Sequence, residues 1–314
     1  MKTSSRATFI AATAALVAAP PAALAATAGA LLTIEMGTGP VTRVRFSPDG
    51  RLIVASSSSG VANVYTATGS HVARLAGQRA PMFSANFDRT STRIVTTGYD
   101  GTIVIWSTGG RRLKHLQARD AAVTDAFFTP RGDDLVVSCD DGTTSRLTLD
   151  GHIVWSIERP GVARCLALSH DGTLVASTSD SGLLSLIGID GREDARIATG
   201  QTRLNAIGFN PVRPELVSGG RDGTAIVWTF EGERIATIGH RGGPWANGVA
   251  FDRSGGLICV AGEEGALRVA STGGQARPAR DASSVALTAV ACAKEREMAI
   301  VGDASGTLRT FLIG

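Results

Sequence analysis

Three features of the sequence predict an all-β fold made of seven similar four-stranded units. First, the 314 residues include 38 glycines, few aromatic residues and many Val, Ile and Thr, which indicates many short strands joined by tight turns. Second, one glycine recurs at intervals of 40 to 42 residues. Third, each interval contains four short apolar runs separated by turn sequences. The hydrophobic content of 43% is enough to build a sizeable core.

The recurring glycine closes a turn of the Asp-Gly type that leads into a short strand. The stretch "GYDGTIVIW" at residues 98–106 is one example, and "RDGTAIVW" at residues 221–228 is another. Periods of 20 to 50 residues are typical of solenoids, propellers and repeat arrays. The seven equivalent positions are Gly60, Gly101, Gly142, Gly182, Gly223, Gly265 and Gly306.

Each unit has the order of strands and turns that is expected of a propeller blade. A first run ends in an aromatic or aliphatic residue, and a turn such as "SPDG" or "SHDG" follows it. A second run, the Asp-Gly turn and a third run come next, and a hairpin turn such as "EGE" leads to a fourth run such as "RIATI". Four antiparallel strands in about 40 residues make one propeller blade.

The two ends of the chain predict how the ring closes. The seventh unit stops at Gly314, eight residues after Gly306, where its fourth strand should begin. The apolar run "LLTI" at residues 31–34 stands where a fourth strand would precede the first unit. We therefore predict a seven-bladed β-propeller of four-stranded antiparallel blades over residues 31–314, with the last blade closed by the N-terminal strand at about residues 31–36. Closure removes the unpaired sheet edges at which proteins aggregate.

The first 25 residues have the layout of a secretory signal peptide. Lys2 and Arg6 precede an apolar stretch, and Ala23-Leu24-Ala25 fits a small-x-small cleavage site. Residues 26–30 would then be a short linker. An uncleaved anchor is disfavoured, because Pro20-Pro21 interrupts an apolar run shorter than the ~20 residues of a spanning helix. We expect an exported protein, periplasmic or secreted, with no membrane span after signal removal.

The chain resembles the WD-repeat (Trp-Asp repeat) propeller family across residues 31–314. The matching stretches are "FSPDG" in the first unit, "GYDGTIVIW" in the second, "SGGRDGTAIVW" in the fifth and the Gly239-His240 pair. No Trp-Asp dipeptide is present: Ser107 follows Trp106, and Thr229 follows Trp228. The resemblance implies a buried hydrogen-bond set, which carries over here only in part, to Asp100, Trp106, Ser218, Asp222 and Trp228.

An up-and-down meander places the Asp-Gly turns and the loops between blades on one face, which we call the top face. The side chains on it that predict a binding surface for a partner are those of Arg79, Tyr99, Arg119, Arg159, Arg203, Arg241, Trp245 and Arg280. One interpretation is an arginine ring that recognises an acidic peptide, a phosphate or a carboxylated glycan through forked hydrogen bonds. The other is structural: Arg119 and Arg159 stand where the family places its His, and would pair with the turn acid of their own blade.

Several classes of site lack support in the sequence. The five histidines occupy five different places in the repeat, so we expect no metal site. Neither a nucleophile motif nor a phosphate-binding loop is present, and no catalytic residue or cofactor is predicted. Beyond residue 25 the formal charge is only +1, which is no footprint for nucleic acid. Four cysteines allow disulfides, but core-like positions favour free thiols.

The leading hypothesis is an exported, monomeric, non-enzymatic scaffold that binds a protein or peptide through its top face. A lactonase-like or quinoprotein-like propeller is the first alternative, and a glycan- or envelope-binding module is the second. The enzyme alternative needs acids or histidines that converge on the central tunnel. The first-strand positions nearest the tunnel offer one base and one acid, on non-adjacent blades, and they read Arg43, Ser84, Asp125, Cys165, Ala206, Gly248 and Ala289.

Overall fold

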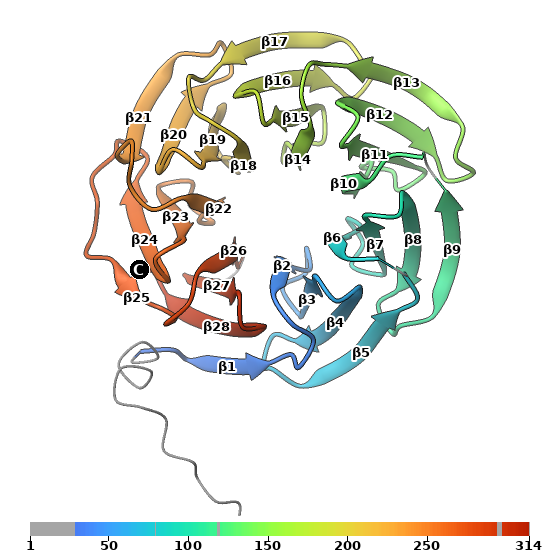
Figure 1. Cartoon of the computed structure of the whole chain (residues 1–314), viewed down its shortest axis with the longest axis horizontal. Helices are drawn as coiled ribbons and strands as arrows, with labels where there is room; N and C mark the ends of the chain where they lie inside the picture. The colour runs from blue at the N-terminus through green and yellow to red at the C-terminus, as the bar shows by residue number, and fades with distance from the viewer. Residues whose placement is uncertain (1–28, 79, 118–119, 294–296, 314) are drawn as a thin grey trace, which may run out of the picture.

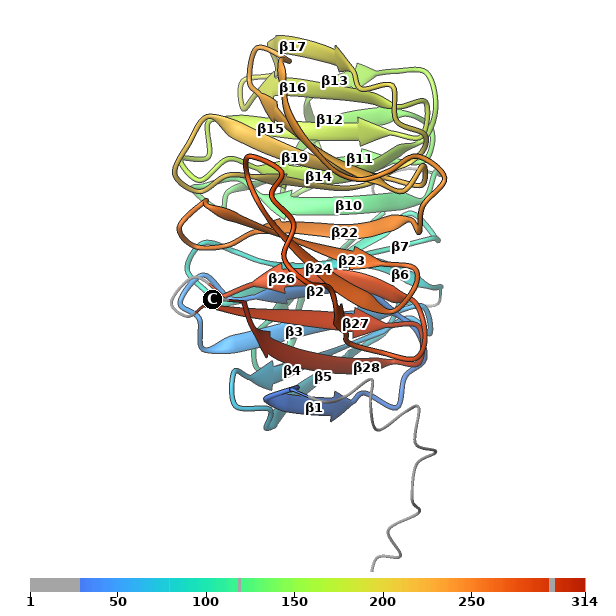
Figure 2. The same ribbon diagram turned by 90° about the vertical axis from the view of Figure 1, so that its left-hand side faces the viewer.

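The computed structural model describes residues 29–78, 80–117, 120–293 and 297–313, and within them the chain is all β. It forms seven four-stranded sheets arranged as blades around a central axis, which confirms the predicted seven-bladed propeller (Figure 1). The predicted signal peptide and most of the linker lie outside the described residues. Seen from the side, the strands of all the blades run between the same two faces of the ring (Figure 2).

The blades are numbered 1 to 7 along the chain, and each contributes one strand to each of four concentric layers. The innermost, first strands are β2 (Val41–Phe46), β6 (Met82–Phe87), β10 (Val123–Phe128), β14 (Ala163–Leu168), β18 (Leu204–Phe209), β22 (Ala246–Phe251) and β26 (Leu287–Cys292). The second strands are β3 (Leu52–Ser57), β7 (Arg93–Gly98), β11 (Asp134–Cys139), β15 (Leu174–Ser179), β19 (Glu215–Gly220), β23 (Leu257–Gly262) and β27 (Met298–Asp303).

The two outer layers complete the blades. The third strands are β4 (Val61–Thr66), β8 (Thr102–Ser107), β12 (Thr143–Thr148), β16 (Leu183–Gly188), β20 (Thr224–Thr229), β24 (Ala266–Ser271) and β28 (Thr307–Leu312). The fourth strands are β5 (His71–Ala76), β9 (Arg112–Gln117), β13 (Ile153–Glu158), β17 (Glu193–Ala198), β21 (Arg234–Gly239), β25 (Arg280–Asp281) and, in blade 7, β1 (Leu32–Glu35).

The seventh blade is closed by the N-terminal strand, as predicted. β1 pairs antiparallel with β28 in the register Leu32↔Thr310 to Glu35↔Thr307, and the sheet order is β1-β28-β27-β26. Figure 1 shows the blue β1 alongside the red β28. In blade 6, by contrast, the fourth strand is only two residues long. Pro278, which has no N–H to donate, precedes it and limits the pairing of that segment.

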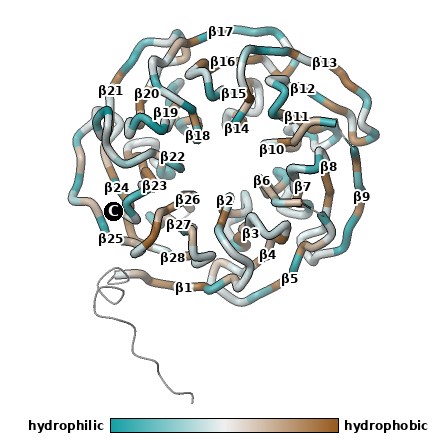
Figure 3. Tube along the Cα trace, viewed as in Figure 1, coloured by the Kyte–Doolittle hydropathy of each residue, from teal (hydrophilic) through white to brown (hydrophobic). Residues whose placement is uncertain are grey.

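The core lies between the blades. The second and third strands are buried along most of their length, because neighbouring blades cover both faces of each sheet. The fourth strands face solvent on one side and therefore alternate: β5 reads exposed, exposed, buried, exposed, buried, exposed. The outer strands carry both hydrophilic and hydrophobic residues along their length (Figure 3). The run of apolar residues along a strand thus differs between the buried second and third layers and the solvent-facing fourth layer.

The recurring turn glycine is required for two reasons. Its φ is positive, for example +87° at Gly142 and +90° at Gly223, a conformation that side chains disfavour. A Cβ at Gly142 would also stand 2.2 Å from the carbonyl oxygen of Arg159, in the loop that leads to the next blade. At the seam of the ring, a Cβ at Gly306 would lie 2.6 Å from the oxygen of Gly39. The glycine therefore recurs once in every blade because it packs against the loop that leads to the next blade.

Candidate functional site

The top face is built as the meander predicted. The turn between the second and third strands of a blade donates a backbone N–H to the loop that leads into its first strand. Tyr99 N to Pro81 O is 3.0 Å, Arg221 N to Thr202 O is 2.9 Å, and Glu263 N to Trp245 O is 3.1 Å. Turns and loops are thereby held at fixed spacing around the ring, as a rigid frame for a binding surface.

Three arginines and a tryptophan gather on this face over blades 4 to 6. We call Arg164, Arg203, Arg221 and Trp245 the top cluster. Arg164 occupies the bulge near the start of β14, where the ladder register shifts between Ala163 and Cys165. Such bulges re-aim side chains at the rims of sheets. Arg203 lies in the loop before β18, and Arg221 in the turn after β19.

Arg221 and Trp245 form the aromatic part of the cluster. The guanidinium carbon of Arg221 lies 4.3 Å from the centroid of the Trp245 ring, which is a cation–π contact. Both side chains are half-buried. The stacking holds the guanidinium plane in one orientation, so that its N–H groups are available in a fixed direction.

The electrostatics of the top cluster are those of an excess of positive charge. Burial lowers the pKa of Arg221, and the nearby charges of Arg203 and Arg164 lower it further, while Glu263 acts in the opposite direction. Arg164 Nη2 pairs with Asp180 Oδ2 at 3.2 Å. The Nε atoms of Arg164 and Arg221 are buried without a hydrogen-bond partner among the described residues. An anion placed here would compensate the repulsion between the guanidinium groups.

Arg203 is held in an unusual backbone conformation. Its φ is +45°, one of two positive values at non-glycine residues of the described chain. Its N–H bonds to the oxygen of Asp180 at 3.3 Å, which ties its loop to the turn of blade 4. A left-handed conformation at a residue with a side chain costs about 1–2 kcal/mol and persists where the surroundings fix it.

The other predicted top-face residues do not form one ring. Arg159 is 7% exposed and bonds Glu193 of β17 at 2.7 Å, rather than the turn acid Asp180. Arg241 donates to the oxygen of Gly200 at 2.7 Å, and Arg280 is exposed in β25. Tyr99 is 62% exposed, with its ring 6.0 Å from that of Phe83. Arg79 and Arg119 lie outside the described residues. Of the predicted set, the structure brings Arg203 and Trp245 together, through Arg221.

The predicted structural set forms a continuous chain of hydrogen bonds in blade 5. Trp228 Nε1 donates to Ser218 Oγ at 2.9 Å, and Ser218 bonds Gln201 at 2.5 Å. Gln201 Nε2 donates to Thr224 Oγ1 at 3.0 Å, and Thr224 donates to Asp222. A glutamine thus joins the serine to the turn. It anchors the loop that carries Arg203 to the sheet below.

Blade 2 has the same parts but not the same continuity. Trp106 Nε1 donates to Thr96 Oγ1 at 2.9 Å, and Gln78 bonds Thr102, which bonds Asp100. The Oε1 atom of Gln78 is buried without a partner among the described residues, so the two halves are not joined. The sequence reasoning missed both glutamines. Gln78 stands nine residues before Phe87, in the position at which Arg119 and Arg159 were noticed.

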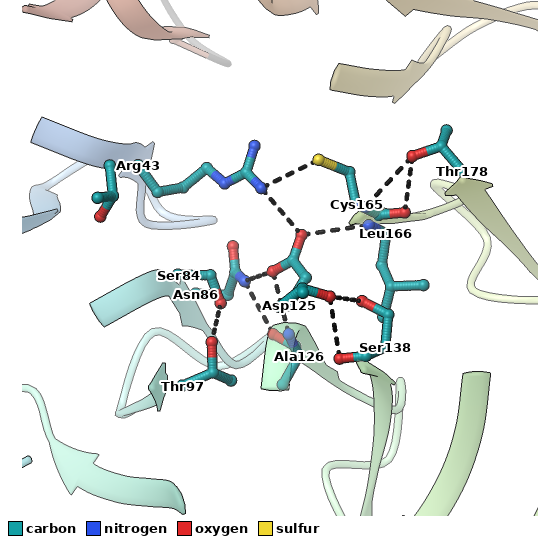
Figure 4. Close-up of polar contacts among 12 residues, drawn as sticks. Arg43, Ser84, Asn86, Thr97, Asp125, Ala126, Ser138, Cys165, Leu166 and Thr178 are labelled. Carbon is teal, nitrogen blue, oxygen red and sulfur yellow. Dashed lines mark hydrogen bonds and ion pairs between the residues drawn. The ribbon is translucent and has the colours of Figure 1, made fainter. Parts of the chain in front are cut away.

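The base and the acid of the tunnel positions meet at the centre of the ring, although their blades are not adjacent. Arg43 reaches from blade 1 across the centre, with Nη2 3.4 Å from Asp125 Oδ2 and 3.3 Å from Cys165 Sγ (Figure 4). Asp125 is fully buried and accepts three more hydrogen bonds. Its other donors are Asn86 Nδ2 at 2.9 Å, Ala126 N at 3.0 Å and Leu166 N at 3.2 Å.

This central bridge is an ion pair whose carboxylate is saturated, whereas the Nε of Arg43 has no hydrogen-bond partner among the described residues. Burial lowers the pKa of Arg43, but Cys165 and Asp125 raise it by more, so the guanidinium stays charged. The carboxylate of Asp125 has donors on both oxygens, which leaves no open position for a proton transfer or a ligand. Within the described ranges no three His, Cys, Asp or Glu side chains gather as a metal-binding group. The bridge therefore reads as a cross-ring connection between blades 1, 3 and 4.

The opposite, bottom end of the ring contains a cavity of about 640 Å³ that the sequence reasoning missed. Phe87, Phe128, Phe209 and Phe251, which end four of the first strands, line it together with Phe127. The sequence pattern predicts the four strand-end residues only as the apolar ends of the first runs, and it does not single out Phe127. Of the thiols, Cys165, Cys259 and Cys292 are free, and Cys292 also lines this cavity. The described segments contain no helix that could span a lipid bilayer.

The chain is similar in sequence to several known proteins. A profile of the family "WD domain, G-beta repeat" matches residues 30–66, 69–107, 144–187 and 195–229. Each matched span covers strands of two blades that are consecutive around the ring, and two of the spans include the third-strand tryptophans Trp106 and Trp228.

Two WD repeat-containing proteins of Synechocystis sp. are similar to this chain. One, named as uncharacterized, is 33% identical over 214 residues, which is 68% of this chain and 64% of that protein. The other is 33% identical over 195 residues, or 62% of this chain and 60% of that protein. The chain thus spans less than two thirds of either relative. Transcription initiation factor TFIID subunit 5 of Caenorhabditis elegans is 24% identical over 60% of this chain and 30% of its own length.

Proposed function

Because this chain is a member of the WD-repeat family of propellers, we propose that it is a non-enzymatic scaffold that binds an acidic segment of a protein partner on its top face. WD-repeat propellers are typically platforms for protein–protein interaction. The face and the chemistry of the partner are our proposals. The observation that carries them is the convergence of Arg164, Arg203 and Arg221 beside Trp245.

The charge balance of the top cluster supports an acidic partner. Of its three guanidinium groups, the one that forms an ion pair is Arg164, with Asp180 at 3.2 Å. No ion pair within the described part of the chain involves Arg203 or Arg221, and the Nε of Arg221 has no acceptor there. Carboxylates of a partner would supply acceptors in the forked geometry that guanidinium groups prefer.

The rigidity of the site supports recognition of a short segment. Gln201 anchors the loop of Arg203 to Ser218 and Thr224, and Trp245 holds Arg221 by stacking. Side chains that are ordered before binding lose less conformational entropy when a partner arrives. Trp and Arg are also the residue types that most often dominate interface energies.

The experiment uses a fluorescein-labelled peptide of alternating Glu and Gly as the probe and measures its binding by fluorescence anisotropy. Arg203→Gln/Arg221→Gln and Trp245→Ala are the test variants. Arg234→Gln is the matched control, because Arg234 is an exposed arginine on the outer strand β21. We expect the double variant to bind at least tenfold more weakly, with unchanged melting temperatures throughout.

Two results would contradict the proposal. One is equal binding of the double variant and the Arg234→Gln control. The other is equal binding of a Gln-Gly peptide of the same length, which would show that negative charge is not what the site recognises. A pull-down with the wild-type protein and the double variant would then identify partners held by another surface.

We also propose that the protein is exported and cleaved after Ala25. The support is the sequence alone: a basic start, an apolar stretch and the Ala23-Leu24-Ala25 motif. Mass spectrometry of the protein recovered outside the cytoplasm of an expression host should give an N-terminus at Ala26. Replacement of Ala23 and Ala25 by Arg should block the cleavage. A cytoplasmic product that retains Met1 in the wild type would refute export.

A further inference from the structure

The bottom cavity carries an inference that does not depend on the proposed function. It lies where the seven first strands end and turn toward the second strands, at the end of the ring opposite the top cluster. Its volume of about 640 Å³ is within the range of about 300–1,000 Å³ typical of small-molecule sites. Three consecutive positions of the repeat build it: the strand end, the next residue and the residue after that.

The strand-end position forms an apolar wall. In blades 2 to 7 it lines the cavity, and these residues are Phe87, Phe128, Leu168, Phe209, Phe251 and Cys292. Phe127, which is half-buried, adds a fifth phenylalanine from blade 3. Aromatic and aliphatic side chains around one space favour an apolar ligand, because filling it removes apolar surface from water on both sides.

In blades 1 to 6 the next position holds a side-chain hydrogen-bond acceptor that is used within its own turn, and in blade 7 it is Ala293. Asp252 accepts from Leu257 N at 2.7 Å and from Ser254 N at 3.1 Å. Asp88 accepts from Thr92 N at 2.8 Å and pairs with Arg93 at 2.9 Å. Asp252 is the one carboxylate among the described residues that line the cavity. Its hydrogen bonds hold it in the turn, and the next residue, Arg253, carries the opposite charge.

The third position forms a rim in which prolines alternate with basic side chains. In chain order, blades 1 to 6 present Pro48, Arg89, Pro130, His170, Pro211 and Arg253, and all six line the cavity. Arg89 and Arg253 are exposed, and neither makes an ion pair within the described part of the chain. The sequence puts Lys294, which lies outside the described residues, in the seventh position. No acid occurs at this position in any blade.

Positive charge also extends inward from the cavity. Arg45 lies on the first strand of blade 1, at the repeat position that Phe127 occupies in blade 3. Arg45 Nη1 donates a hydrogen bond to the neighbouring Val44 O at 3.2 Å. Burial lowers the pKa of Arg45 to about 10, and the charge of Arg43 acts in the same direction. The axial field behind the apolar wall therefore attracts anions rather than cations.

We propose that the bottom cavity binds an aliphatic chain that ends in a carboxylate, that is, a fatty acid. The chain lies against the phenylalanine wall, and the carboxylate stays at the rim, where Arg89 or Arg253 supplies forked N–H donors. The prolines between the cations keep the rim stiff and apolar, which suits the first methylene groups of the chain. An alkylammonium ligand of the same length is rejected by the same charges.

The test measures binding of octanoate, decanoate and dodecanoate, below their micellar concentrations, by isothermal titration calorimetry. Each added CH₂ should strengthen binding by about fourfold, the factor expected for transfer of one methylene out of water. Decyltrimethylammonium, with the same apolar chain and a positive head, should bind at least tenfold more weakly than decanoate.

Variants locate the site. Arg89→Gln/Arg253→Gln should weaken decanoate binding at least fivefold. Arg131→Gln is the matched control, since Arg131 is an exposed arginine of a bottom turn that does not line the cavity. Cys292→Phe, which puts into blade 7 the residue type that ends five other first strands, should fill part of the cavity and weaken dodecanoate more than octanoate. A variant is used only if its melting temperature equals that of the wild type. The Arg203→Gln/Arg221→Gln variant should bind decanoate as the wild type does.

Several outcomes would overturn the proposal. They are the absence of saturable decanoate binding, equal affinity for the ammonium amphiphile, and equal loss in the Arg131→Gln control. Tighter binding of a peptide with a C-terminal phenylalanine than of any alkanoate would assign the cavity to a polypeptide partner instead. A loss of decanoate binding in the Arg203→Gln/Arg221→Gln variant would place the ligand on the top face and refute the cavity assignment.

Discussion

The two ends of the ring differ in how their side chains are supplied. At the top, Arg203 and Trp245 come from loops of different sequence, and Arg164 from a bulge, so neighbouring blades present different groups. At the bottom, equivalent positions of successive blades present the same kind of group, phenylalanine at the wall and proline or a cation at the rim. The loops provide an individual site, whereas the repeat itself provides a ring-like one.

The central bridge separates these two ends. Arg43 spans the middle of the ring to Asp125 and Cys165, and the top cluster and the bottom cavity share no residue. Substitutions in the top cluster should not change ligand binding in the bottom cavity. Substitutions in the bottom cavity should likewise not change peptide binding at the top cluster, unless the central bridge is broken.

Breaking the bridge should have the largest effect. Asp125→Leu would leave Arg43 buried without its carboxylate, beside Arg45, and should lower the free energy of unfolding by about 3–5 kcal/mol. Urea denaturation followed by tryptophan fluorescence measures this loss. The double variant Asp125→Leu/Arg43→Met should regain the part of this loss that comes from the uncompensated charge. The part that comes from the donors Asn86 Nδ2, Ala126 N and Leu166 N, which lose their acceptor in both variants, should remain. A double variant as unstable as the single one would disprove the ion-pair account.

The anchors of the top loops should show the next largest effect. Gln201→Ala would leave Ser218 and the carbonyl of Thr224 without their buried partner, and should cost about 2 kcal/mol of stability. Gln78→Ala should lower the stability by only about 1 kcal/mol. Gln78 makes no hydrogen bond to Thr96, and its Oε1 atom already lacks a partner among the described residues. Thermal denaturation of the two variants compares them directly. Equal costs would mean that continuity of the hydrogen-bond chain adds nothing.

Acid stability should report on the Arg159 anchor. Burial opposes ionisation of Glu193, but hydrogen bonds from Arg196 and Arg159 outweigh it and lower its pKa to about 2. A depressed pKa stabilises the fold above the ordinary value near 4.5, and that contribution is lost as the pH falls toward 2. Since Glu193 is partly solvated, we expect about 1–2 kcal/mol.

The measurement for this prediction is the free energy of unfolding of the wild type and Glu193→Gln between pH 7 and pH 2. The variant should be less stable at pH 7, and the two curves should converge at the acidic end. A constant difference across the whole range would mean that the charge of Glu193 is not what stabilises the loop.

The smallest expected effect is a difference in how salt changes ligand binding at the two ends of the ring. The acidic peptide at the top cluster should bind about three- to fivefold more weakly in 0.5 M than in 0.05 M NaCl, because exposed charges are screened. The gain per CH₂ of the alkanoates at the bottom should not fall over the same range, since burial of methylene groups involves no charge. A peptide affinity that does not change with salt would argue against charge recognition at the top.

The sequence was sufficient for the fold because the repeat period is a physical contact. Each recurring glycine packs against the loop to the next blade, so counting glycines counted blades. The closing strand followed from the same count. The predicted Trp228, Ser218 and Asp222 set was found in one blade, but the glutamine that joins it carries no spacing signal of its own and was missed.

The candidate sites were harder to predict because they depend on contacts between blades far apart in sequence. Arg43 and Asp125 are 82 residues apart, and only the curvature of the ring brings them together. Arg221 was hidden beside the conspicuous Asp222, and its stacking on Trp245 crosses from blade 5 to blade 6. The basic rim of the cavity could have been found by aligning the units two residues past each strand end, where Pro48, Arg89 and Pro130 stand in register.

The pairing of β1 with β28 has a consequence for the order of folding. Glu35 and Thr307 are 272 residues apart, whereas a blade closes within about 40 residues. A span roughly seven times longer costs only about 1.7 kcal/mol more in loop entropy, which four paired residues can offset. The blades should therefore form first and the seam last. Until then β28 exposes an unpaired edge that the β1 of another chain can occupy, so refolding at high protein concentration should yield strand-exchanged dimers.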